Sequence, residues 1–294
     1  MFLRLAKIII SIAMLVRGAE ILACINCVSQ DPLALSPQEQ WKVYLGLSRE
    51  DSFGFVDAKG LDVHQFGLET RNTTTIAVGH TFSPQAYMTV TRPYLVNKRG
   101  ADQRSGWGDV MVTGRYVIIP EGVDDDWMPQ IQGIVAVMDG RATSGYDYQD
   151  PAQLDVFGSG VPQWRVGVDA WHGMSDWKGG LAGNLSGPIE SRRTEFGLVR
   201  NGLTFGLTAT GGYGYGDRQK VLWGIIIEKT TSKVINDVSV ANSASQGATV
   251  FLSGEAAIAH NAVIQLMLEK TLAIGFLKNF GRSDTVTGAL VRSF

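Results

Sequence analysis

The side chains that most often carry out catalysis are sparse in this sequence. Its imidazoles are His64, His80, His172 and His260. A barrel-type esterase needs a histidine followed closely by a serine, with a polar partner that orients the ring. No histidine begins a His-x-Ser-Asn arrangement, and Ser175 follows His172 by three residues in a stretch that reads as a turn. We therefore predict that the protein is not an enzyme.

Three other patterns could suggest ligand chemistry. The stretch "GGYGYGDR" at 211–218 lacks the Gly-Lys-Ser/Thr ending of a phosphate-binding loop, and no helix pattern follows it. The run "DDDW" at 124–127 lacks the ligand spacing of a calcium loop. Cys24 and Cys27 are the only cysteines, so no second pair completes a zinc site. They form a signal remnant, a small disulfide or a candidate thiol pair, and we predict no cofactor and no metal.

Composition excludes one further class of partner. The chain has 294 residues, 45% of them hydrophobic and 18% charged, with a formal net charge of −2. A nucleic-acid-binding surface needs clustered Lys and Arg, and no basic run interleaved with aromatic residues is present. We predict no nucleic-acid partner.

The N-terminal residues have the pattern of an export signal. Arg4 and Lys7 precede a short apolar core, Ile8 to Val16, which is too short to span a bilayer as a helix. We predict a signal peptide at 1–23 and a polar entry segment at 24–38. Ile21 to Cys24 loosely resembles a lipoprotein processing box, so lipidation of Cys24 stays open. No later apolar run approaches 18 residues, which argues against a membrane helix but not against a membrane barrel.

Apolar and other residues alternate along most of the remaining chain. In "GWGDVMVTGRY" (106–116), one parity holds Val110, Val112, Gly114 and Tyr116, and the other holds Asp109, Met111, Thr113 and Arg115. A period of two indicates a β-strand with two different faces. Similar alternation occurs at 41–48, 162–173, 193–199, 202–213, 220–229 and 261–270. We expect about 12 antiparallel strands over residues 39–294, joined alternately by short turns and by longer loops. The expected long, polar, Gly-rich loops are 97–106, "PEGVDDDWMP" (120–129), 139–160 and 231–247.

The composition of the less apolar parity separates two β architectures. In a soluble sandwich that face meets bulk water and is rich in Lys and Glu. Here it mixes isolated charges with Gly, Thr, Gln, Met and Trp, which suits a crowded lumen. We therefore predict an all-β fold, a single transmembrane β-barrel, whose charged lumen residues pair with one another. The candidate lumen-lining, substrate-binding residues are Asp109, Arg115, Arg165, Asp169, Trp171, Gln265 and Glu269.

Several stretches, taken in order, resemble a known family. They are "AYMTVTRPYL", "GWGDVMVTGRY", "PQIQGIVAVMDGRATSG" and "GSGVPQWRVGVDAWHGMSDWKGGLAGNLS". This order, from about residue 70 to 294, resembles the outer-membrane family of meta-pathway phenol-degradation transporters. The resemblance implies a barrel channel for small compounds, including hydrophobic or aromatic ones. The terminal Phe294 is typical of a signal read by the barrel-assembly machinery.

These observations lead to one main hypothesis and three alternatives. We expect a channel in the outer membrane of a Gram-negative bacterium, surrounded by lipid and passing small-molecule substrates passively in or out. A closed barrel would instead serve as a structural anchor or an adhesion surface. A barrel enzyme would need a catalytic cluster that the sequence does not display, and a soluble β protein would partition into buffer without detergent.

Overall fold

The computed structural model describes most of the chain beyond its N-terminal segment. The described residues are 39–56, 61–120, 128–144, 149–150, 154–174, 176–194, 197–215, 219–272 and 278–294. The expected signal peptide (1–23), the entry segment (24–38) and both cysteines lie outside these ranges. The expected barrel region, 39–294, holds every strand described below.

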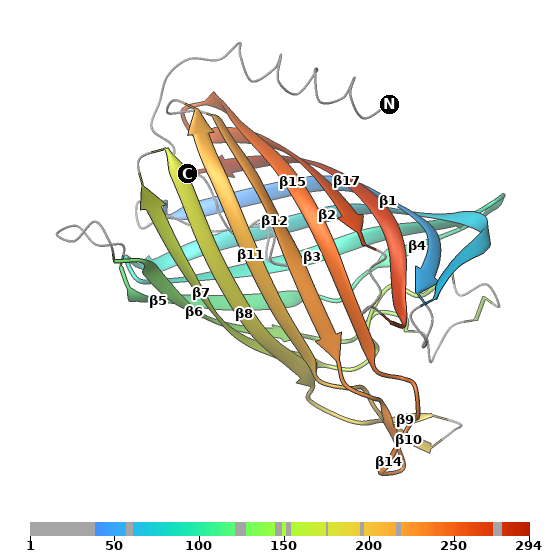
Figure 1. Ribbon diagram of the computed structural model, residues 1–294. Coiled ribbons are helices and arrows are strands. Elements are labelled where there is room, and N and C mark those ends of the chain that lie inside the picture. The colour runs from blue at the N-terminus through green and yellow to red at the C-terminus, as the bar shows by residue number, and fades with distance from the viewer. Residues whose placement is uncertain are drawn as a thin grey trace.

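The main sheet is an antiparallel barrel (Figure 1). Its strands are β1 (Trp41–Val56), β2 (Asp62–Ser83), β3 (Ala86–Arg99), β4 (Asp102–Trp107), β5 (Met111–Ile119), β6 (Gln130–Met138), β7 (Gln163–Met174), β8 (Trp177–Pro188), β11 (Thr204–Tyr215), β12 (Gln219–Thr230), β15 (Ser245–Ala259), β16 (Ala262–Thr271) and β17 (Phe280–Ser293). The pairing of β1 with β17 closes the ring. Both β4 and β5 pair with β3, so the thirteen strands found in the described residues occupy twelve positions around the barrel. The expected strand number is therefore confirmed.

Two ends of the barrel differ in the length of their connections. Trp41 and Phe294 hydrogen-bond to each other's backbone at one end, where β2–β3, β7–β8 and β15–β16 are joined by tight turns. The long connection from β6 to β7 leaves from the opposite end. Short periplasmic turns and longer extracellular loops are the rule for outer-membrane barrels, so we call the first end periplasmic and the second outer.

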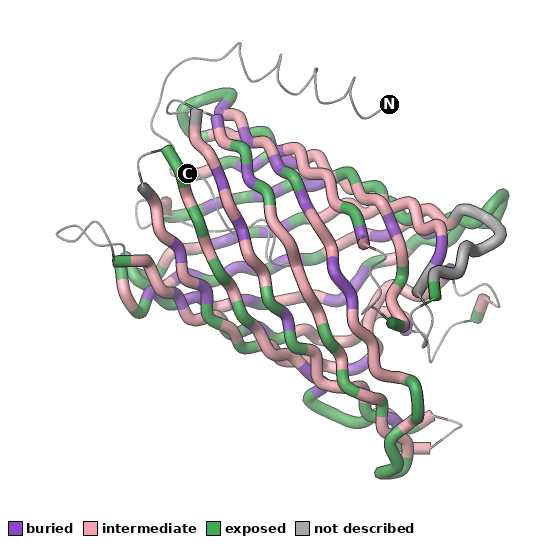
Figure 2. The backbone as a smooth tube through the Cα atoms, in the orientation of Figure 1, coloured by how far each residue is buried: buried purple, intermediate pink, exposed green. Residues whose placement is uncertain are grey.

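The stretch 106–116 illustrates how an alternating sequence forms a wall with two different faces. In β5, Val112, Tyr116 and Ile118 are exposed, whereas Thr113 and Arg115 are buried. β1 behaves the same way, with Trp41, Val43, Leu45 and Leu47 all exposed and Lys42 and Tyr44 buried. Figure 2 shows this alternation of exposed and buried residues around the barrel. The apolar parity thus faces outward, toward lipid, as the sequence predicts.

The structure corrects several boundaries of the expected strands. Residues 193–199 form no barrel strand, because β9 (Arg192–Thr194) and β10 (Gly197–Arg200) join β13 (Val234–Ile235) and β14 (Val238–Ser239) in a separate small sheet at the outer end. The stretch 97–106, expected as a loop, is largely a hairpin of β3 with β4. The expected loop at 231–247 runs into β15, whose Ala, Gly and Ser residues carry little hydrophobic signal. The expected loop "PEGVDDDWMP" falls at the periplasmic end, and most of it lies outside the described residues.

Candidate functional site

The interior face of the barrel is the candidate site. Many of its side chains are polar, among them Thr89, Thr113, Gln132, Ser253 and Gln265, and all of these are buried. A period-two strand places such residues inward whenever its apolar residues face lipid, because neighbouring side chains point to opposite faces. The interior therefore combines hydrogen-bonding groups with buried apolar side chains.

Two of the predicted lumen residues form a buried ion pair. Arg115 on β5 donates from Nη1 to Asp169 Oδ2 on β7 at 2.9 Å, and their side chains are 0% and 2% exposed. The pair spans β6, where Gln132 lies in register with Asp169 and also faces the interior. Burying both charges is favourable only with close pairing, which this geometry provides. The expected pairing of interior charges is thus present on one side of the bore.

Asp109 lies inside the wall but has a different set of partners. It is placed between β4 and β5, and its carboxylate accepts hydrogen bonds from the backbone N–H of Ala142 and Ser159, at 2.8 and 2.7 Å. The Ser159 hydroxyl donates to it as well, at 3.0 Å. Three charge-assisted hydrogen bonds hold the connection between β6 and β7 against the wall. Asp109 therefore anchors a loop, whereas the sequence suggested that it pairs with a cation across the bore.

The same connection also contacts the interior face of the wall farther along. Asn97, an inward-facing residue of β3, donates from Nδ2 to the carbonyls of Leu154 and Val156 at 2.8 and 3.2 Å. The Phe157 ring lies so close to Gly106 on β4 that an added Cβ would stand 2.5 Å from it. Residues 154–158 thus lie against the inner wall near the outer end, where they narrow the lumen.

Arg192, in the loop between β8 and β11, forms hydrogen bonds to the connection between β6 and β7. Its Nη1 donates to the Gly160 carbonyl at 2.5 Å and to Ser144 Oγ at 3.3 Å. Ser144 is 1% exposed, so the contact is shielded from solvent. The outer mouth is therefore bordered by two loops that are hydrogen-bonded to each other.

A second polar cluster lies on the β15–β16 side of the interior. Gln265 donates from Nε2 to Ser253 Oγ and to Glu255 Oε1, each at 3.3 Å. Glu269 is on the same face of β16, four residues nearer the outer end, and is partly exposed. Arg165 also faces inward on β7 and is partly exposed. The next inward-facing residue of that strand is Gly167. The predicted residues thus lie on the interior face, but they form separate groups on different strands.

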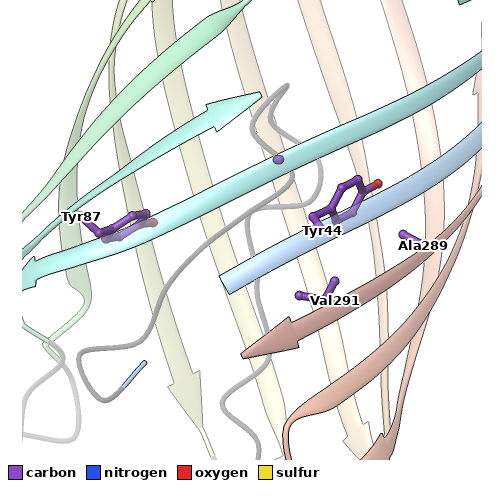
Figure 3. Close-up of a cluster of buried hydrophobic side chains, with 5 residues drawn as sticks. Tyr44, Tyr87, Ala289 and Val291 are labelled. Carbon is purple, nitrogen blue, oxygen red and sulfur yellow. The ribbon is translucent and has the colours of Figure 1, made fainter. Parts of the chain in front are cut away.

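Aromatic rings contribute to the periplasmic half of the lumen. Tyr44, Tyr87, Ala289 and Val291 form a buried cluster with Ala77 (Figure 3). The Tyr44 ring covers Gly46, where an added Cβ would stand 2.6 Å from a ring carbon. Trp171 on β7 is 8% exposed on the same interior face. Among these rings only Trp171 was predicted, although the parity of Tyr44 opposite Trp41 and Val43 signals its inward direction.

Lys42 and Glu255 are further interior charges that sequence reasoning missed. Lys42 is 5% exposed and donates to Glu39 Oε2 at 2.9 Å at the periplasmic entrance. Its position between outward-facing Trp41 and Val43 was the available signal. Glu255 lies in β15, a strand that the sequence did not reveal. Both residues extend the charged lining beyond the predicted set.

The described residues show no arrangement for metal chemistry. They contain no group of three or more His, Cys, Asp or Glu side chains placed to hold a metal ion.

His80 lies among aromatic residues at the periplasmic end of the barrel. Its ring contacts those of Trp41 and Phe82, at centroid distances of 4.2 and 4.9 Å. No helix in the described part of the chain is long and apolar enough to cross a bilayer.

Comparison with solved structures supports the architecture. The chain is similar to the COG4313 outer membrane channel from Pseudomonas putida F1, with a TM-score of 0.73 and 13% identity over 89% of this chain and 97% of that one. It is also similar to the NanC porin, with a TM-score of 0.51 and 10% identity over 86% of this chain and all of that one. No family model and no curated protein matches the sequence. The shared feature is the fold, that of an outer-membrane β-barrel, and the phenol-degradation resemblance stays a prediction.

Proposed function

We propose that this outer-membrane barrel is a passive channel for small molecules. The observation that carries the proposal is the interior face of a closed barrel, which bears mutually paired charges and hydrogen-bonding side chains. Such a lining replaces the hydration of a solute that crosses the wall, whereas an apolar filling would only stabilise the barrel. The inward-lying residues 154–158 act as the constriction that selects solutes by size.

Small aromatic or hydrophobic compounds are the substrate class that we propose. Tyr44, Tyr87 and Trp171 line the periplasmic half of the lumen beside polar groups. Aromatic rings bind planar solutes by stacking, and the neighbouring hydroxyl and amide groups bind polar substituents. This chemistry agrees with the phenol-type resemblance of the sequence. We propose Arg115, Arg165, Asp169, Gln265 and Glu269 as the polar part of the lining, with Asp109 acting through the loop that it anchors.

Planar-bilayer conductance of the refolded protein tests the channel. We expect discrete conductance steps that change in size when Arg115 is replaced by Ala. Val112→Ala is the matched control, because Val112 lies on the same strand and faces lipid. If the conductance steps of Arg115→Ala equal those of the wild type, the ion pair does not line the channel. Swelling of protein-containing vesicles in phenol against a sugar of similar mass then tests the preference for aromatic solutes.

One observation favours a second candidate, a closed structural or adhesion barrel. Arg115, Asp169, Lys42 and Glu255 are each at most 7% exposed, although they face the lumen. Burial of this degree is typical of a filled interior. The absence of conductance, together with normal heat-modifiable gel mobility, would establish the closed barrel and refute the channel.

We further propose that residues 1–23 direct export and that the C-terminus directs insertion. Phe294 is 62% exposed at the end of β17, and the Arg292 guanidinium carbon lies 5.0 Å from the centre of its ring. An accessible terminal aromatic residue is available to the barrel-assembly machinery. Deletion of Phe294 should lower the amount of heat-modifiable protein in the outer membrane while leaving refolding in detergent intact.

A further inference from the structure

A polar cavity interrupts the barrel wall beside β4. Within the described pairings β4 bonds only to β3, so its second edge is free of any strand. A cavity of about 370 Å³ lies at this place, lined by outward-facing residues of β3 and β4, by the beginning of the connection after β6, and on its inner side by Gly106 and Phe157. Its main side chains are Arg92, Ser105, Trp107, Asp139, Arg141 and Phe157.

Two arginines at this cavity have no acidic partner within the described part of the chain. Arg92 is exposed on the lipid side of β3, and its guanidinium carbon lies 4.8 Å from the centre of the Trp107 ring. Arg141 is also exposed. The nearby Asp139 uses Oδ1 to accept the backbone N–H groups of Val110 and Arg141, at 3.0 and 3.4 Å. A cation on the lipid face of a barrel is costly unless an anion compensates it.

The position of the cavity along the membrane normal indicates which molecule supplies that anion. Trp107 and Tyr94 face outward, and their ring centres lie 5.1 Å apart in an edge-to-face contact near the outer end. Aromatic girdles mark the level of the lipid head groups. The arginines therefore lie at the interface of the outer leaflet, where phosphorylated glycolipids supply the anions.

An apolar groove runs along the same face toward the periplasmic end. It has a volume of about 650 Å³ and is lined by Met88, Gly114, Tyr116, Ile118, Val135 and Val166, among others. Met88 lies four residues from Arg92 on β3, about 13 Å along the strand, with exposed Val90 between them. A Cβ added to Gly114 would meet only the Val135 carbonyl, at 3.9 Å, so the floor of the groove is open.

We propose that this face binds one phosphorylated glycolipid of the outer leaflet. Arg92 and Arg141 hold a phosphate group, for which the guanidinium fork is well suited. One acyl chain of the same molecule occupies the groove over Gly114. The polar cavity and the apolar groove are independent observations. Both lie along β3, with the arginines nearer the outer end, which is the arrangement that an amphiphile with its charged end at the outer interface requires.

Native mass spectrometry of the detergent-solubilised full chain tests the site. The probe is bisphosphorylated lipid A, with dephosphorylated lipid A and inorganic phosphate as comparison ligands. We expect one tightly retained lipid A. The Arg92→Gln/Arg141→Gln variant should bind it roughly tenfold or more weakly, because charge-assisted hydrogen bonds are lost. Gly114→Leu should weaken retention of lipid A by filling the groove, without affecting phosphate.

Two variants serve as matched controls. Lys229 is an exposed, outward-facing cation on β12, and Lys229→Gln should leave binding unchanged. Gly183 is an exposed wall glycine on β8 with open space where a Cβ would stand, so Gly183→Leu should also be silent. Equal binding by wild type and the double arginine variant would overturn the phosphate site. Displacement of lipid A by millimolar inorganic phosphate, with no effect of Gly114→Leu, would overturn the glycolipid and leave a simple anion site.

Discussion

The Arg115–Asp169 pair allows a quantitative test of how strongly the barrel interior excludes water from charged side chains. Replacing Asp169 by Ala leaves the Arg115 guanidinium, which is 0% exposed, without its 2.9 Å partner. Removing one member of a buried ion pair costs about 3–5 kcal/mol of unfolding free energy. Replacing both residues, as Arg115→Met/Asp169→Leu, removes both desolvation penalties, and the cost should fall to about 1 kcal/mol or less.

Urea unfolding of the refolded protein in lipid vesicles measures these differences. The exposed pair Lys270–Asp284 is the internal control, because its N–O distance is similar, 3.0 Å, and its side chains are 50% and 41% exposed. Asp284→Ala should cost no more than about 1 kcal/mol. An Asp169→Ala variant as stable as Asp284→Ala would refute burial of the pair. A double variant less stable than Asp169→Ala would refute the reasoning about desolvation.

Three further predictions concern the loop, the wall and the lipid face. Asp109→Ala removes three hydrogen bonds to the connection between β6 and β7, and limited proteolysis should cut this connection faster than in wild type. Gly106→Val places a side chain against the Phe157 ring and pushes residues 154–158 toward the centre of the bore, so single-channel current should fall. Leu181→Arg puts a charge on the exposed lipid face of β8 and should cost about 2–4 kcal/mol in urea unfolding, whereas Leu181→Val should cost under about 1 kcal/mol.

Local alternation determined the fold class, the strand number and the direction of most side chains. A strand has only two faces, so the parity of Trp41, Val43 and Leu45 in β1 predicts both their exposure and the inward direction of Lys42 and Tyr44. The same rule placed Arg115 and Asp169 inside. It failed for β15, because Ala, Gly and Ser alternate without a hydrophobic contrast. It also assigned 193–199 to the wall, since a short strand outside the membrane has the same local pattern.

Contacts between distant segments were decided only by the tertiary structure. No local pattern reveals that Asp109 accepts hydrogen bonds from Ala142 and Ser159, or that Asn97 holds the carbonyls of Leu154 and Val156. These contacts depend on barrel closure and on the path of a long loop, and both are set by packing over many residues. The cavity at Arg92 and Arg141 arises in the same way, where β4 ends and the loop after β6 begins. Sequence alone therefore determined which face most wall residues occupy, and the closed barrel determined which residues contact one another.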